Sequence, residues 1–339
     1  MNDNIFESIP AQRREHVKAA LVATFDSTPV TSLEKVIGGV SALTYRIEMA
    51  GRPYLLRLDV SRGLRFDSRR GYECMQIAAE AGIAPPLRHA NPDTAIAIMD
   101  FVVQRPLAQY RGGVSALARD VGSLIARLQK TPTFPELGEY PVLIERMLNY
   151  ARGSARFVSG LLDPHAEGLQ RIREAYAWDN TTLVSSHNDP NPRNILFDGE
   201  RLWLVDWETS CRNDPLTDVA IATHEIAATP QLEDVLLQAW LGSVPDDYLR
   251  ARLFLMQQLT RLYYGCIMLG AIASRPAGQP IQNLTAPTPA EFRLAVEKGE
   301  LKPGSPETAF ILAKICLAGF MTGVSAPRFK EALRISKQG

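Results

Sequence analysis

The chain has 339 residues, and its 37 basic and 37 acidic side chains leave a formal net charge of zero. Hydrophobic residues make up 46% of the sequence, as in an ordinary globular protein. The balanced charge gives no basic surface for DNA or RNA, so no nucleic-acid partner is expected. The four cysteines are scattered, which argues against a zinc site or a disulfide framework.

The start of the chain lacks the apolar core of a signal peptide. The apolar stretches at residues 265–273 and 311–324 are shorter than the roughly 20 residues that a membrane helix needs. We therefore expect a cytoplasmic protein without a membrane span. The sequence indicates no particular oligomeric state.

The first hundred residues are expected to form mainly antiparallel strands. After a predicted helix that follows Pro10, β-prone runs occupy residues 34–39, 43–49 and 54–59. A helix is predicted over residues 68–81, where Gly82 would end it, and a further hairpin over 87–100. The pattern indicates a small β-rich lobe at residues 1–103.

From about residue 105 the sequence is mainly helical in pattern. Helices are predicted near residues 115–130, 142–159, 164–177, 216–228, 231–241 and 247–273. Short apolar runs at residues 183–186, 195–197 and 202–205 predict an island of strands among them. A segment rich in proline, glycine and threonine at 275–290 predicts a long loop. Residues 104–339 are thus expected to form a larger, mostly helical lobe.

Three side chains between residues 185 and 220 have a spacing that suits phosphoryl transfer. Asn194 follows Asp189 by five residues, and Asp206 stands at the end of a short predicted strand. Phosphoryl transfer from a nucleotide needs a carboxylate to take the proton of the acceptor hydroxyl. It also needs hard oxygen ligands to hold Mg²⁺ against the phosphates. A loop followed by a hairpin can bring these three side chains to one cleft.

The pattern H-x-D-x-x-x-x-N, followed by D-W-E and N-D-P-x-x-D-V-A, resembles the aminoglycoside phosphotransferase and choline kinase superfamily. The H-N-D and D-W-E variants are most similar to its bacterial choline/ethanolamine-kinase-like branch. The resemblance implies an α+β, protein-kinase-like fold with two lobes, a small antiparallel β-rich N-lobe and a larger, mostly helical C-lobe. It also implies that ATP and Mg²⁺ are needed.

The resemblance implies a role for each matching residue. Asp189 would be the catalytic base, and Asn194 and Asp206 would be the Mg²⁺ ligands. His187 would be structural and would hold the loop by hydrogen bonds. Asp218 would brace the same loop from the helix that follows.

The N-lobe supplies the candidate nucleotide-binding residues. Backbone N–H groups at Gly38, Gly39 and Ser41 are expected to cover the phosphates, because glycine allows a close approach. In kinases, the strand residue that corresponds to Arg57 binds the α- and β-phosphates and pairs with a helix glutamate. This predicts Glu73 as the partner of Arg57, and an arginine suits bidentate phosphate contact.

The segment Met99, Asp100, Phe101 and Val102 matches the kinase hinge, whose backbone would hydrogen-bond adenine. The sequence contains neither G-x-x-x-x-G-K-[ST] nor G-x-G-x-x-G. Neither a P-loop nor a Rossmann site is therefore supported.

The spacing after Asp206 favours a small acceptor, because the next helix begins too soon for an activation loop that would hold a peptide. Carboxylates near the metal site and aromatic side chains in later helices suit a cationic acceptor. The candidate acceptor-binding residues are Trp207, Glu208, Asp214, Trp240 and Tyr264.

The sequence thus predicts an ATP- and Mg²⁺-dependent kinase that phosphorylates a hydroxyl of a small amino alcohol such as choline or ethanolamine. One alternative is a phosphotransferase acting on an aminoglycoside, thiamine or a sugar alcohol. Another is a nucleotide-binding protein without catalysis, against which the intact Asp189, Asn194 and Asp206 argue.

Overall fold

The computed structural model describes residues 3–36, 42–60, 67–275 and 278–338. The chain divides into two compact units. The first comprises residues 1–137, 184–218 and 225–243, and the second comprises residues 138–183, 219–224 and 244–339. The predicted boundary between residues 103 and 104 does not coincide with this division and stays a prediction.

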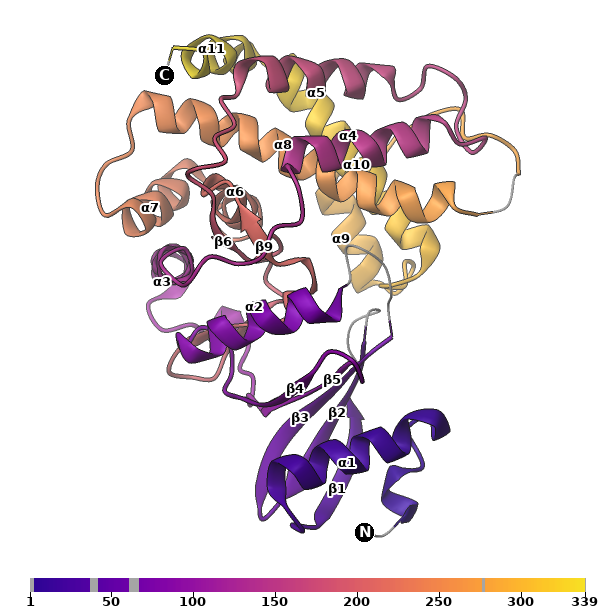
Figure 1. Ribbon diagram of the computed structural model, residues 1–339. Helices are drawn as coiled ribbons and strands as arrows, with labels where there is room; N and C mark the ends of the chain where they lie inside the picture. Colours follow the sequence, from indigo (N-terminus) through magenta and orange to yellow (C-terminus); the bar gives the residue numbers. More distant parts are fainter. Residues whose placement is uncertain (1–2, 37–41, 61–66, 276–277, 339) are drawn as a thin grey trace. The chain divides into compact units, whose positions relative to one another are not determined.

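The first unit contains a five-stranded antiparallel sheet in the order β1-β2-β3-β5-β4 (Figure 1). The strands are β1 (Val30–Val36), β2 (Ala42–Met49), β3 (Arg52–Asp59), β4 (Leu87–Asn91) and β5 (Ile96–Asp100). Tyr45, Ile47 and Leu56 of the sheet are buried together with Val17 and Leu21 of α1 (Arg14–Phe25). The predicted antiparallel N-terminal region is confirmed.

The hairpin between β2 and β3 sets the register of the sheet centre. Ala50 and Gly51 both have positive φ and connect the facing residues Met49 and Arg52, as in the tight turns that match strand twist. With this register, Arg57 of β3 faces Thr44 of β2 on one side and Ala97 of β5 on the other. Arg57 therefore lies on an inner strand rather than at the edge of the sheet.

In the described part of the chain, three helices, several 3₁₀ turns and four short strands complete the first unit. They are the helices α2 (Ser68–Glu80), α3 (Gly113–Leu128) and α7 (Pro230–Leu241), the 3₁₀ turns η1 (Asp3–Phe6), η2 (Ala11–Arg13), η4 (Leu107–Gln109) and η5 (Trp207–Thr209), and the strands β6 (Val184–Ser186), β7 (Ile195–Phe197), β8 (Leu202–Leu204) and β9 (Cys211–Asn213). Strand β6 pairs with β9, and β7 pairs with β8. The two pairs hold both ends of the segment that carries the predicted catalytic residues.

The second unit is helical. Its helices are α4 (Tyr140–Arg152), α5 (Asp163–Ala175), α8 (Asp247–Ala273), α9 (Pro289–Glu297), α10 (Pro306–Ser325) and α11 (Pro327–Ser336), and it also includes residues 219–224 of α6 (Leu216–Glu225). Helix α8 contacts α4, α10 and α11. The predicted helices before residue 275 are found within a few residues of their expected bounds, apart from the end of α4. Helices α9 to α11 were not predicted.

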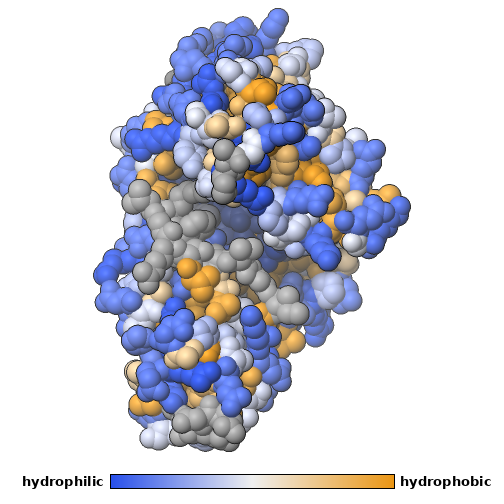
Figure 2. Space-filling view, turned by 90° about the vertical axis from the view of Figure 1, so that its right-hand side faces the viewer, coloured by the Kyte–Doolittle hydropathy of each residue, from blue (hydrophilic) through white to orange (hydrophobic). Residues whose placement is uncertain are grey.

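Helix α10 is, within the described ranges, the one helix long and apolar enough to cross a membrane. It lies against α8 and α5, and its Leu317 and Phe320 are fully buried there. A core helix that packs on its neighbours passes the same test of length and composition. On the face shown in Figure 2, hydrophilic residues predominate and apolar residues form separate patches.

The contact between α3 and α7 predicts a sharp difference between two glycine substitutions. A Cβ at Gly122 of α3 would overlap the backbone carbonyl of Leu236 in α7, whereas one at Gly270 of α8 would meet nothing within 4 Å. We expect Gly122→Ala to lower the free energy of unfolding by about 1–3 kcal/mol through overpacking. Gly270→Ala should raise it by about 0.5–1 kcal/mol, because alanine is favoured in a helix.

Urea unfolding of both variants and the wild type measures this difference. Equal effects of the two substitutions would show that α3 and α7 do not approach as closely as the structure has them.

Candidate active site

A buried carboxylate fixes the loop that follows β6. Asp218 is 0% exposed, and its two oxygens accept hydrogen bonds from the backbone N–H groups of His187 and Asn188, at 2.8 and 2.7 Å. Two consecutive N–H groups can share one carboxylate in this way only if the loop backbone is held in one conformation. Asp218 thus lies where the brace predicted from the sequence would have to be.

His187 supports the loop from behind. Its Nε2 hydrogen-bonds the carbonyl of Val205 at 2.9 Å, and its ring makes an edge contact with Trp207 at 4.7 Å between centroids. Burial lowers the pKa of His187 to about 4, so the ring is neutral at pH 7. A neutral, buried imidazole suits the structural role predicted for His187.

Asn188 is a site residue that the sequence did not single out. Its φ of 63° lies in the left-handed region, which a non-glycine residue adopts only when its surroundings hold it there. Its side-chain oxygen accepts hydrogen bonds from Asn213 at 2.6 Å and from Ser186 at 3.0 Å. Its position directly before Asp189 was the only signal available in the sequence.

Asp189 and Asn194 lie together at the two ends of the loop. The side-chain nitrogen of Asn194 donates to the carbonyl oxygen and to Oδ2 of Asp189, at 2.9 and 3.0 Å. Asn191 donates to the other carboxylate oxygen of Asp189 at 2.7 Å. Two amide groups thus hold the side chain of the predicted catalytic base in place. The residue is half-buried, so part of it is open to solvent.

Asp206 and Glu208 are joined to the sheet by one arginine. Arg57 donates to Asp59 at 2.7 Å, to Asp206 at 2.9 Å and to Glu208 at 3.3 Å. Burial opposes the charge of Arg57, but the three carboxylates raise its pKa, so the guanidinium stays charged. Asp206 has a φ of 70°, which is a strained conformation typical of functional sites.

The predicted pair between Arg57 and Glu73 is wrong. Both residues belong to the described part of the chain, and Glu73 is exposed on α2 while Arg57 pairs with the three carboxylates named above. The reason is the rotation of α2: its residues Arg70 and Cys74, on either side of Glu73, both hydrogen-bond the carbonyl of Ser210. Glu73 points away from that face. A contribution of either residue to nucleotide binding stays a prediction.

A cleft of about 340 Å³ in the first unit joins several of the predicted residues. The predicted metal ligands Asn194 and Asp206 line it, as does Arg57. The whole predicted hinge also lines it, namely Met99, Asp100, Phe101 and Val102. Apolar side chains complete the lining, among them Ala42, Leu55, Met75, Ala84 and Leu196. A mainly apolar cleft with a few polar and charged groups suits a nucleotide, whose base is apolar and whose phosphates are charged.

Two residues of this cleft, Asn194 and Asp206, fit a magnesium ion. The amide nitrogen of Asn194 is turned toward Asp189, which leaves the amide oxygen on the other side for a metal. Asp206 supplies carboxylate oxygens in the same cleft. Oxygen donors of this kind are what Mg²⁺ prefers. Within the described ranges, no three side chains of His, Cys, Asp or Glu gather as a metal site, so an ion here would depend on asparagine and on its own water or phosphate ligands.

Two of the predicted acceptor residues are buried. Trp207 is 2% exposed, and its ring lies against His187 and Phe134. Asp214 is also 2% exposed, and its Oδ1 accepts a hydrogen bond from the backbone of Leu216 at the start of α6. Side chains with so little exposure are poorly placed to contact a diffusing acceptor, and both have a structural explanation. Their neighbour Glu208 is half-buried and lies on Arg57.

The other two predicted acceptor residues lie in different units. Trp240 of α7 is half-buried, and its indole nitrogen donates to Gln129 at 2.8 Å. Tyr264 of α8 is half-buried, and its ring lies 5.9 Å from that of Tyr263. A contact of either residue with an acceptor stays a prediction. The predicted phosphate-covering residues Gly38, Gly39 and Ser41 lie outside the described residues.

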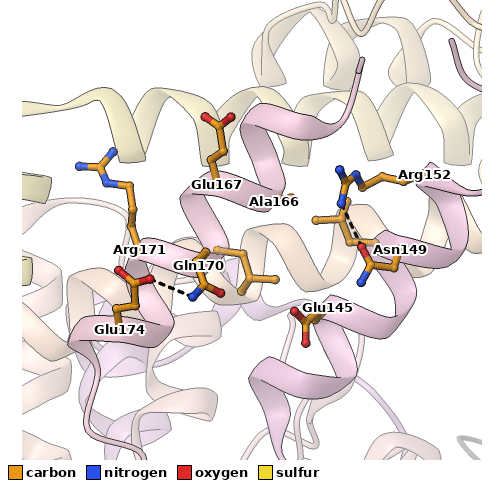
Figure 3. Close-up of a pocket in the computed structure, with 10 residues that line it drawn as sticks. Glu145, Asn149, Arg152, Ala166, Glu167, Gln170, Arg171 and Glu174 are labelled. Atoms are coloured by element: carbon orange, nitrogen blue, oxygen red, sulfur yellow. Dashed lines mark hydrogen bonds between the residues drawn. The ribbon is translucent and has the colours of Figure 1, made fainter. Parts of the chain in front are cut away.

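A larger hollow of about 610 Å³ lies between α4 and α5 in the second unit. Figure 3 shows Glu145, Asn149 and Arg152 of α4 along one side and Gln170 and Glu174 of α5 along the other. Charges of both signs line it, and the dashed bonds join neighbours on the same helix. None of the residues predicted for catalysis or binding lines this hollow, so its size alone does not make it the active site.

Comparison with known proteins agrees with this geometry. A family model described as the phosphotransferase enzyme family matches residues 32–254. Protein LicA of Haemophilus influenzae is 41% identical over 217 residues, which are 60% of this chain and 61% of LicA. The chain thus spans less than two thirds of the length of this curated relative. A second match to LicA of this species covers 22% of its length.

Solved structures share the fold. A choline/ethanolamine kinase family protein from Mesorhizobium loti superimposes with a TM-score of 0.68 and 21% identity, covering 96% of this chain and all of the other. The choline kinase LicA from Streptococcus pneumoniae gives 0.62 and 14%, covering 91% of this chain and all of the other. A structure of LicA in complex with AMP also gives 0.62. The predicted α+β, protein-kinase-like fold is confirmed.

Asp218 predicts a measurable dependence of stability on pH. Burial raises the pKa of Asp218 to about 6, although the two N–H groups of the loop act in the opposite direction. The folded chain therefore binds this proton more tightly than the unfolded chain does, in which an aspartate has a pKa of about 4. The stability that this group contributes is complete below about pH 4 and is lost as the pH rises through about 6.

Asp218→Asn removes this titration. The free energy of unfolding of the wild type relative to Asp218→Asn should fall by about 3 kcal/mol between pH 4 and pH 7. Chemical denaturation of both proteins across this range measures the difference. Parallel pH profiles for the two proteins would mean that the carboxyl of Asp218 keeps an ordinary pKa.

Proposed function

We propose, since the chain belongs to the phosphotransferase enzyme family, that it is an ATP- and Mg²⁺-dependent kinase that phosphorylates a hydroxyl of a small amino alcohol. The observation that carries the proposal is the cleft in which Asn194 and Asp206 lie with the hinge segment. The loop bond between Asn194 and Asp189 brings the predicted base to the same end of that cleft.

The cleft has the parts that a nucleotide needs. The backbone N–H groups of Asp100 and Phe101 already donate to Pro86 and Pro53, so Val102 carries the next N–H along the hinge for adenine. Arg57, which also lines the cleft, supplies a positive charge for the phosphates. Mg²⁺, when bound between Asn194 and Asp206, would supply positive charge that stabilises the phosphoryl group during transfer.

Asp189 is suited to act on the acceptor rather than on the nucleotide. The amides of Asn191 and Asn194 hold its carboxylate in one orientation, and its partial exposure leaves it accessible to a hydroxyl. We propose that it orients this hydroxyl and takes its proton. Because Asp189, Asn194 and Asp206 are intact and held by specific hydrogen bonds, a nucleotide-binding protein without catalysis is the weaker alternative.

Choline or ethanolamine is the proposed acceptor. The support is the likeness to LicA and to kinases of the choline/ethanolamine family, together with the short connection between Asp206 and α6, which suits a small acceptor. Aminoglycosides, thiamine and sugar alcohols are the alternatives. A cytoplasmic location is part of the proposal.

The acceptor can be identified by thermal unfolding. With Mg²⁺ and a non-hydrolysable ATP analogue present, a ligand at 100 times its dissociation constant stabilises the folded state by about 2.7 kcal/mol. Choline or ethanolamine should therefore raise the melting temperature, and neither thiamine nor an aminoglycoside should do so. If only thiamine or an aminoglycoside raised the melting temperature, the proposed acceptor would be wrong, but the proposed kinase activity would still stand.

Asp189→Asn tests the mechanism. The substitution should leave the affinity for ATP nearly unchanged and lower kcat by about 10²–10⁴-fold, because asparagine cannot take the acceptor proton. Steady-state kinetics, nucleotide titration and a melting curve measure the three quantities.

The control for this variant is Asp93→Asn, which changes an exposed aspartate of the same unit. It should leave all three quantities unchanged. If kcat of Asp189→Asn falls less than about threefold at unchanged stability, Asp189 is a loop cap and not the base.

A further inference from the structure

We propose that Asp59 is the residue that positions Arg57 for the nucleotide phosphates, in the place of a glutamate on α2. The inference rests on the proposed function. In the kinase pattern, a glutamate of a helix pairs with the residue that binds the phosphates, and here a residue of β3 would do so. Asp59 would thus be a positioning residue rather than a catalytic one.

The geometry of the pair is that of two neighbours on one strand. Arg57 and Asp59 are separated by two positions on β3, so both side chains leave the same face of the sheet. The Nε of Arg57 donates to Oδ1 of Asp59 at 2.7 Å, and the two side chains are only 12% and 13% exposed. A short, shielded ion pair of this kind is stronger than the pairs that a protein forms at its surface.

The bond to Nε directs the rest of the guanidinium group. Nη1 then points to Asp206 and Nη2 points to Glu208. These two carboxylates stand on the segment that follows β8 and carries the predicted metal ligand. A carboxylate that binds Mg²⁺ gives up much of its attraction for an arginine. Asp59 stands on β3, outside that segment, so it stays available to Arg57 when a metal binds Asp206.

Asp59 is itself firmly held. Its N–H donates to the carbonyl of Ala95 at 3.0 Å, and its own carbonyl accepts a hydrogen bond from Arg13 at 3.2 Å. Arg13 also binds the carbonyls of Thr94 and Ala95, at 2.7 and 3.1 Å. With its backbone held on both sides, Asp59 can hold Arg57 without a partner on α2.

Without the Asp59 carboxylate, Asp206 and Glu208 would be the only anions holding Arg57. Arg57 would then bind Asp206 more tightly. Because Asp206 is also the predicted Mg²⁺ ligand, Mg²⁺ would have to compete with the arginine for it. Loss of Asp59 should therefore weaken nucleotide binding and also raise the Mg²⁺ concentration that binding requires. A residue that merely stabilised the sheet would change the melting temperature and leave the Mg²⁺ requirement unaltered.

The test compares Asp59→Asn with Glu73→Gln, which neutralises the exposed carboxylate on α2 at the position where the kinase pattern expects the partner. Titration calorimetry with a non-hydrolysable ATP analogue, repeated over a series of Mg²⁺ concentrations, reads both effects. For Asp59→Asn we expect affinity to fall about tenfold, as for the loss of one charge-assisted hydrogen bond. The Mg²⁺ concentration for half-maximal binding should rise by about threefold or more, as Arg57 competes for Asp206. Glu73→Gln should lower the affinity and raise the Mg²⁺ requirement less than Asp59→Asn does.

In turnover, Asp59→Asn should raise KM for the nucleotide and change kcat much less, because its effect is on phosphate binding rather than on the acceptor. If Asp59→Asn does not fold, Asp59→Ser, with a smaller side chain, is read in the same way. Equal behaviour of the variants at residues 59 and 73, with the wild type binding nucleotide, overturns this inference alone. A wild-type protein that binds no nucleotide overturns the proposed function together with it.

Discussion

The candidate site depends on one buried carboxylate. Asp218, at 0% exposure, gives its two oxygens to two consecutive backbone N–H groups of the loop, and desolvation of the charge is the cost of that arrangement. The backbone at residues 187 and 188 is thereby fixed, so Asn188 can keep its left-handed conformation. The side chain of the next residue, Asp189, then has one orientation. The hydrogen bonds from Asn191 and Asn194 to Asp189 then need only complete an orientation that Asp218 has already set.

A second constraint is the balance of charge around Arg57. One guanidinium group meets three carboxylates, so the cluster is negative overall before any ligand binds. Such an excess of negative charge suits a divalent cation and supports the proposed Mg²⁺ site. The left-handed Asp206 fits this account, because a strained residue persists where the surrounding structure holds it for function.

The parts of the fold and site that depend on local sequence could be predicted. The turn at Ala50 and Gly51, the long α8 and the order of Asp189, Asn194 and Asp206 are all readable from short segments. Helix α9, which was not predicted, also has a local signal in the capping box of Thr288 and Glu291. Burial was not predictable: Trp207 stands next to the site in sequence, but its side chain turns into the core.

The unpredicted partner of Arg57 has its cause in α2. This helix turns toward the segment of residues 206–210, and its buried Arg70 donates to the backbone carbonyls of Glu208 and Ser210, at 2.9 and 3.0 Å. Gly71 also faces this segment, since a Cβ there would lie at van der Waals distance, 3.4 Å, from the carbonyl oxygen of Trp207. Residues 70, 71 and 74 thus face the segment that carries Asp206, and the helical period turns residue 73 away. Helix α2 still contacts the segment that carries the predicted metal ligand Asp206, through Arg70 and backbone carbonyls. The charge of Arg57 is therefore balanced by Asp59 of its own strand together with Asp206 and Glu208, and not by α2.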